Sequence, residues 1–229
     1  MKRSPSTLLL CVAFACLCHF SALSQAGELA LNVVKKEPPG AVDESIRKTL
    51  QPTAIQLLDG DKAAFEFWLS SEIALQSKPA SPTAAMDSLK QSALLGVVAV
   101  ASDTRDYKDV ELFAGVYTMR FALQPQDGNH LGTAEFNYFA VLVPSKKDVK
   151  PDGITDYKAL VRASRAGTPS DHPVILSLRP VSSIEGETPK LNEPAPDHKS
   201  VILKIPARVE GGEPGALLLE LVYQGKGKV

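Results

Sequence analysis

Two apolar segments of different pattern, joined by a polar stretch, constrain the fold of this 229-residue chain most strongly. Residues 115–123 alternate with period two, as a half-buried strand does. One face carries Tyr117, Met119, Phe121 and Leu123, and the other carries Val116, Thr118, Arg120 and Ala122. Residues 136–143 are apolar on both faces, which is typical of a strand covered on both sides. Residues 124–133 between them are rich in turn formers, so the pattern predicts two strands and a loop.

Strand-like runs recur along the rest of the chain. They lie at 28–36, 53–58, 63–69, 94–101, 174–179, 201–208 and 217–223. Short helices are expected at 43–50, capped by Asp43, at 83–92, and at 155–165, capped by Thr155 and ending near Gly167. Eight or nine short strands without a βαβ rhythm predict a mainly β fold, an antiparallel two-sheet sandwich in one domain over 27–224.

Two further segments are expected to lie outside the regular sheets. Residues 180–199 contain four prolines and few apolar side chains, so we expect an exposed, mobile insertion. Residues 102–111 are charged and predict a surface connection, and residues 225–229 predict a flexible tail.

The first 26 residues predict a cleaved signal peptide. Lys2 and Arg3 precede an apolar run, and Ser24-Gln-Ala26 places small residues where a signal peptidase cuts. A lipid anchor at Cys16 is a less favoured alternative, because the residues upstream of it fit poorly. We therefore expect a secreted or periplasmic protein without a transmembrane segment in the mature chain.

The composition after residue 26 excludes several classes of protein. All three cysteines lie in the first 26 residues, so a disulfide framework is excluded for the remainder. Removing the two basic residues at 2 and 3 leaves 23 basic and 26 acidic side chains, a formal charge of −3. This balance does not favour a nucleic acid or an anionic membrane surface as a partner.

The loop after the 115–123 strand is the first candidate site. Asp127 and Asn129 offer oxygens two residues apart, His130 offers a nitrogen, and Glu135 follows. Such donors suit a divalent metal ion, with His172 as a further ligand if the fold brings it close. The alternative is a tight loop in which Asp127 and His130 bond locally.

Two other places offer chemistry. Asp171 precedes His172 and could orient it as a base, although sequence neighbours on an extended segment rarely face each other. Trp68 stands beside Glu66 on the face opposite Phe65 and Phe67, so it could stack on a carbohydrate if that face is exposed. The ligand-binding candidates are therefore Trp68, Glu66 and, in addition, Arg120. For the Asp171–His172 pair and for Trp68, a structural role is the favoured alternative.

Signatures of common enzymes are missing. The sequence contains no Gly-x-Ser-x-Gly, His-Glu-x-x-His or phosphate-binding loop, and no cysteine nucleophile after residue 26. No catalytic residue is assigned, although a pair of carboxylates brought together by the fold stays open.

The stretch 115–132, with Tyr138-Phe-Ala-Val-Leu-Val-Pro144, resembles a group of exported bacterial proteins of unknown function. The resemblance implies a secreted or periplasmic β-rich domain and transfers no catalytic residue.

We therefore expect a non-catalytic binding module for an envelope component or a carbohydrate. The alternative is a metal-binding protein or metal-dependent hydrolase that uses the loop from Asp127 to His130.

Overall fold

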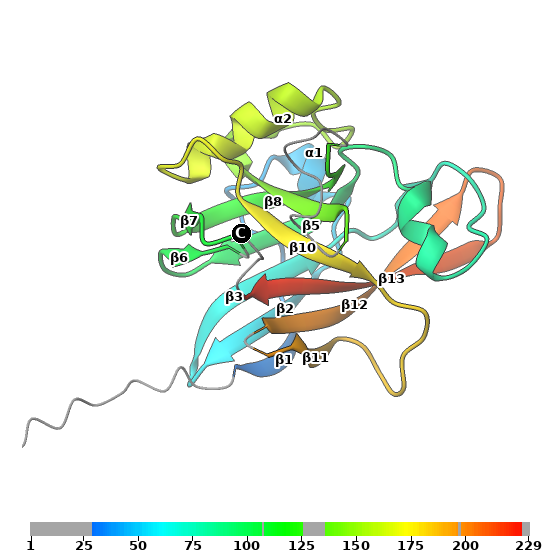
Figure 1. Ribbon diagram of the computed structural model, residues 1–229, viewed down its shortest axis with the longest axis horizontal. Coiled ribbons are helices and arrows are strands. Elements are labelled where there is room, and N and C mark those ends of the chain that lie inside the picture. The colour runs from blue at the N-terminus through cyan, green and yellow to red at the C-terminus, as the bar shows by residue number, and fades with distance from the viewer. Residues whose placement is uncertain (1–28, 107, 126–135, 197, 226–229) are drawn as a thin grey trace, which may run out of the picture.

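The computed structural model describes residues 29–106, 108–125, 136–196 and 198–225 (Figure 1). The mainly β class expected from the sequence is confirmed. Its strands are β1 (Ala30–Lys35), β2 (Thr53–Asp59), β3 (Lys62–Leu69), β4 (Ile73–Leu75), β5 (Leu94–Val100), β6 (Thr104–Arg105), β7 (Glu111–Leu112), β8 (Gly115–Leu123), β9 (Tyr138–Pro144), β10 (Ile175–Pro180), β11 (Lys190–Ala195), β12 (His198–Val209) and β13 (Pro214–Gln224). Its helices are α1 (Glu44–Arg47) and α2 (Tyr157–Ser164), with 3₁₀ turns η1 (Thr83–Ser88), η2 (Ser145–Lys147) and η3 (Arg165–Gly167).

The strands do not separate into the two sheets of the predicted sandwich. Eleven of them form one sheet in the order β1-β2-β3-β5-β8-β9-β10-β13-β12-β11, with β4 paired to β12, and β6 and β7 form a separate small sheet. All neighbours are antiparallel except β4 and β12, which run parallel. The sheet is continuous because β8 pairs with β5 on one side and with β9 on the other.

The large sheet curves until its two halves face each other around one core (Figure 1). Phe65 of β3 and Tyr223 of β13 are far apart in the sheet order, yet their ring centroids are 5.8 Å apart. The same core includes Phe67, Met119 and Leu219, all almost completely buried. Burial of these apolar side chains is the main favourable contribution to folding.

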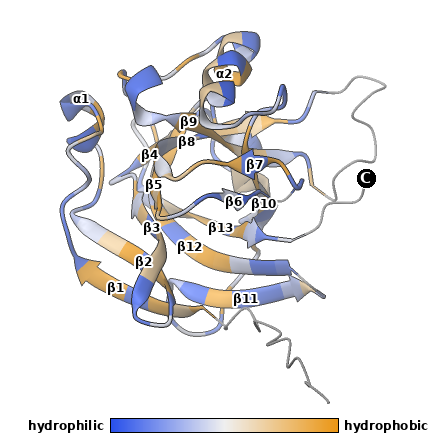
Figure 2. Cartoon of the chain, turned by 90° about the vertical axis from the view of Figure 1, so that its left-hand side faces the viewer, coloured by the Kyte–Doolittle hydropathy of each residue, from blue (hydrophilic) through white to orange (hydrophobic). Residues whose placement is uncertain are grey.

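Two helical segments cover the outer face of the sheet. The α1 segment packs Val42, Ile46 and Leu50 on Trp68 and Val97 of β3 and β5. The second helix, α2, lies over β9 with Leu160 at the centre of a separate apolar cluster, and Figure 2 shows it crossing above β8 and β9. These covers exclude water from both faces of the central strands.

Strand β8 therefore differs from the half-buried strand that its sequence predicts. Thr118 and Arg120, on the face expected to be polar and solvated, are both fully buried. The period-two pattern reports correctly which side chains share a face. The covering of the second face depends on α2 and on residues 144–154, which no local pattern reveals.

The predicted helices are found with two differences: the helix expected at 83–92 is the 3₁₀ turn η1 over Thr83–Ser88, and the cap of α2 is shifted by one residue. Asp43 caps α1 by accepting a hydrogen bond from the Ser45 N–H at 2.9 Å. Asp156 rather than Thr155 caps α2, and its carboxylate accepts the Ala159 N–H at 2.7 Å. Aspartate and threonine are both good capping residues, so composition alone does not choose between neighbours.

Two segments are more ordered than expected. Residues 190–195, within the predicted insertion, form β11 at the edge of the sheet, paired with β12. The expected surface connection at 102–111 contains β6 and β7 and buries the carboxylate of Asp106. In both segments the backbone pairs although the composition is polar. Residues far away in the chain form that pairing or support it.

Candidate functional site

A cleft of about 680 Å³ opens beside α2, over the outer face of β8, β9 and β10. This volume lies within the range of small-molecule sites. Apolar side chains from all three strands form its floor, together with one wall from α2. They are Ala122, Leu123, Phe139, Val141, Ile175 and Val161.

The helix supplies its wall through residues four apart. Tyr157, Val161 and Arg165 recur at the spacing that places side chains on one side of an α-helix, and all three line the cleft. Leu160 and Ser164 point instead into the protein and are fully buried. At the far end of β8, Leu123 is 46% exposed, so part of the apolar floor is open to solvent.

The polar groups around the cleft are mainly cationic. Lys158 is exposed on α2, Arg165 is exposed directly after its last residue, Lys108 follows β6, and His172 is exposed just before β10. Among the described residues that line the cleft there is no carboxylate. The cleft therefore combines an apolar floor with a positively charged rim.

Asp106 supports the cleft from below without lining it. Its carboxylate accepts backbone N–H groups of Lys108 at 2.8 Å, Val110 at 2.9 Å and Ile175 at 2.9 Å, and so ties the β6–β7 connection to β10. Burial raises the pKa of this carboxyl and outweighs the three N–H groups. Burial also shifts the pKa of Lys108, in this case downwards. The nearby Asp106 raises the pKa of Lys108 and so offsets part of that shift.

The raised pKa of Asp106 predicts a specific pH dependence of stability. Because its folded-state pKa exceeds the ordinary value of 3.8, the folded protein favours the protonated carboxyl. This contribution to the free energy of unfolding is complete below pH 3.8 and is lost as the pH rises through the folded-state pKa. Carboxyl ¹³C NMR should place the Asp106 midpoint above 3.8, with Asp106→Asn assigning the signal. A midpoint at or below the ordinary value would contradict the effect of burial.

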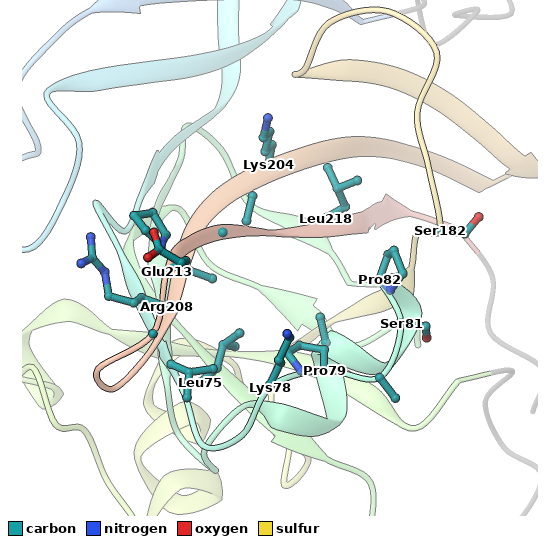
Figure 3. Close-up of a pocket in the computed structure, with 18 of the residues that line it drawn as sticks. Leu75, Lys78, Pro79, Ser81, Pro82, Ser182, Lys204, Arg208, Glu213 and Leu218 are labelled. Carbon is teal, nitrogen blue, oxygen red and sulfur yellow. The ribbon is translucent and has the colours of Figure 1, made fainter.

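A second hollow, of about 1200 Å³, lies beside the β12–β13 hairpin. Figure 3 shows Lys204 and Leu218 on the hairpin, opposite Leu75 at the end of β4 and Pro79 of the segment that follows it. Its cationic side chains are balanced by three glutamates, Glu187, Glu210 and Glu213. Mixed charge selects no class of ligand, so the cleft beside α2 is the better-defined candidate.

The carbohydrate hypothesis requires Trp68 to be an exposed platform on which a sugar can stack, and Trp68 is not exposed. It is 1% exposed, and its indole N–H donates to the Lys36 carbonyl at 2.9 Å. The Lys36 N–H donates to the Pro52 carbonyl, but Pro52 has no N–H that could donate to the Lys36 carbonyl. The Trp68 indole thus satisfies a carbonyl that the strand partner leaves unpaired.

Glu66 lies beside Trp68 as predicted but is already engaged by protein groups. Its carboxylate accepts the Lys36 ammonium at 2.6 Å and the Gln56 amide at 2.7 Å. Burial would raise the pKa of Glu66, but these two hydrogen bonds outweigh it and the pKa is lowered. Glu66 and Trp68 therefore hold β1, β2 and β3 together.

Arg120 has a structural environment rather than a ligand-binding one. Its guanidinium is fully buried and pairs with Asp148, with Nε at 2.6 Å from Oδ2 and Nη2 at 3.0 Å from Oδ1. Its remaining N–H groups donate to the carbonyls of Ser92, Lys150 and Pro151. Thr118 also donates to Asp148, at 2.6 Å. All five N–H donors are used within the protein.

Four of the five residues of the metal hypothesis, Asp127, Asn129, His130 and Glu135, lie outside the described residues. His172 is described, and it borders the cationic cleft. Within 29–106, 108–125, 136–196 and 198–225, no three His, Cys, Asp or Glu side chains are grouped to hold a metal ion. In that same part, no hydrogen bond joins Asp171 to the His172 imidazole. The metal site at 127–135 stays a prediction.

Sequence reasoning missed the cleft beside α2. One signal was present: Lys158 and Arg165 flank the apolar stripe of the strongest predicted helix. The other walls come from 108–110, 122–125, 139–141 and 172–175, which only the fold brings together.

The comparisons give no relative from which a function could be transferred. No family model, curated protein or solved structure matches the chain. In the portion of the chain that the structure describes, no helix is long and apolar enough to cross a membrane.

Proposed function

We propose that this protein is an exported, non-catalytic binding module whose ligand is a small amphipathic anion, bound in the cleft beside α2. The observation that carries the proposal is the apolar floor under a rim that carries Lys108, Lys158, Arg165 and His172 and, among the described lining residues, no carboxylate. Export rests on the N-terminal sequence pattern, which resembles a signal peptide.

The two parts of the cleft would recognise two parts of one molecule. The floor of Phe139, Val141 and Ile175 would take an aliphatic or aromatic body, because burying apolar surface contributes roughly 25 cal/mol per Å². The ammonium of Lys158 and the guanidinium of Arg165 would attract a carboxylate, sulfate or phosphate group at the rim. A neutral sugar would gain little from this combination.

The test compares two fluorescent probes of similar shape and different charge. Anilinonaphthalene sulfonate carries an apolar aromatic body with one sulfonate, and N-phenylnaphthylamine has the body without the charge. We expect the native protein to bind the sulfonate more tightly than the amine, with an affinity that falls as salt is added.

Charge reversal then assigns the site. Lys158→Glu with Arg165→Glu should weaken sulfonate binding about tenfold, a free-energy change of about 1.4 kcal/mol, and leave amine binding nearly unchanged. The matched control, Lys62→Glu with Lys147→Glu, makes the same charge change at exposed positions outside the cleft. Equal weakening by both pairs would mean that the probe responds to net charge, and the proposal would fail.

A further inference from the structure

One buried carboxylate bonds the backbone of three residues that line the cleft beside α2. Asp106 is 2% exposed, and its Oδ1 accepts the N–H groups of Lys108 and Val110. Its Oδ2 accepts the N–H of Ile175, which lies 69 residues further along the chain. Lys108 and Val110 form one wall of the cleft, and Ile175 belongs to its floor. The two oxygens of a single side chain therefore join two separate parts of the cleft.

The Ile175 N–H meets no acceptor from the sheet among the described residues. The Leu142 N–H donates to the Val174 carbonyl at 3.0 Å, so Val174 directs its backbone groups towards β9. Successive residues of a strand direct these groups to opposite sides, so the Ile175 N–H points away from β9. The described pairing of β10 with β13 covers Ser177–Pro180 and does not reach this N–H. Asp106 supplies the acceptor that the sheet lacks here.

The first residues of β10 are attached to both sides of the cleft. The Val174 N–H donates at 3.0 Å to the hydroxyl of Ser164, the last residue of α2. The N–H of the next residue, Ile175, donates to Asp106. Both acceptor residues are buried, so water does not compete for these two hydrogen bonds. The position of the floor relative to each wall therefore depends on one buried side chain.

We propose that Asp106 is a positioning residue for the anion site, a role that rests on the proposed function. By bonding Lys108 and Ile175 together, it fixes the place of a rim cation relative to the apolar floor. One ligand must reach the rim with its anionic group and the floor with its apolar body, so separation of the two parts weakens binding. The charge of Asp106 itself opposes an anion, and its contribution to binding is geometric.

Asp106→Asn tests this role, because an amide cannot accept hydrogen bonds from both parts of the cleft. Its single oxygen can serve either the Lys108 and Val110 N–H groups or that of Ile175, and its NH₂ group then faces the other donor. At neutral pH we expect the dissociation constant for anilinonaphthalene sulfonate to rise about fivefold. Removal of a negative charge would by itself lower that constant, so the sign distinguishes positioning from electrostatics.

Asp103→Asn is the matched control. It removes the same charge from a carboxylate three residues earlier, which accepts the Ala114 N–H at 2.7 Å. Neither Asp103 nor Ala114 lines the cleft. The dissociation constant for the sulfonate should therefore stay the same or fall slightly. Equal weakening by both variants would overturn the positioning role of Asp106.

Amide hydrogen exchange provides a readout that needs no ligand and, with the native protein, no variant. Exchange of at least one of the Lys108, Val110 and Ile175 amides should accelerate in Asp106→Asn. In the native protein, saturation with the sulfonate should slow exchange at these amides, because a contact that favours binding is itself favoured by the bound ligand.

The outcomes separate this inference from the proposed function. A native protein that binds neither probe would overturn the proposed function, and the role of Asp106 with it. Sulfonate binding that is as tight in Asp106→Asn as in the native protein, with faster amide exchange, would overturn the positioning role alone. So would sulfonate binding to the native protein that leaves exchange at all three amides unchanged.

Discussion

Arg120→Met is expected to lower the free energy of unfolding by about 3–5 kcal/mol, which is the usual cost of removing one partner of a buried ion pair. The substitution would leave Asp148 buried at 1% side-chain exposure without its cation. It would also leave the carbonyls of Lys150 and Pro151 without their guanidinium donors. Urea denaturation of both proteins under the same conditions gives the difference directly.

A control and a second variant separate charge burial from loss of packing. Arg162→Met, on the exposed face of α2, should change stability by no more than about 0.5 kcal/mol. Adding Asp148→Leu to Arg120→Met removes the stranded carboxylate and should recover part of the loss. If Arg120→Met were as mild as the control, the ion pair would not be holding residues 148–151 against β8.

Trp68→Ala is expected to have the second large effect. It should lower the free energy of unfolding by about 3–5 kcal/mol, as other substitutions of a buried aromatic residue by alanine do. The indole packs with Ile46 and Val97 under α1, so its removal leaves a cavity there. Trp68→Phe should cost less, about 1–3 kcal/mol, mainly because the Lys36 carbonyl loses its donor. Thermal and urea denaturation measure both variants.

Phe113→Ala is the matched control, because this aromatic side chain is 38% exposed and should contribute little to stability. The carbohydrate hypothesis makes the opposite prediction for Trp68. It requires that Trp68→Ala leave stability nearly intact while weakening binding of a sugar. Observation of that pattern would overturn the assignment of Trp68 to the core.

The sequence predicted which side chains of a strand share a face, but it did not predict whether other segments cover one face of the strand or both. Phe65, Phe67 and Leu69 share the inner face, with Glu66 and Trp68 opposite, as alternation predicts. Whether Trp68 then meets water depends on α1, which covers it from residues 42–50. Alternation is a property of one strand, whereas covering depends on another segment that packs against it.

The burial of Arg120, a ligand-binding candidate, has the same cause. Arg120 looked solvated because it alternates with apolar residues, but its partner Asp148 lies 28 residues away and folds back over β8. A charged side chain in a strand is compatible with exposure or with a buried partner, and only the position of that partner distinguishes them. The cleft beside α2 likewise depends on side chains from five separate segments.

By itself the sequence determined the local structure of this protein: where most of the strands run, where α1 begins and which side chains share a face. These properties depend on residues within a few positions of one another, through strand alternation, turn formers and capping side chains. Tertiary structure alone decided that the strands join into one curved sheet, that Arg120 and Trp68 are buried, and that cations surround an apolar cleft. Those properties require contacts between segments far apart in the chain, and no local pattern specifies which distant segment will supply them.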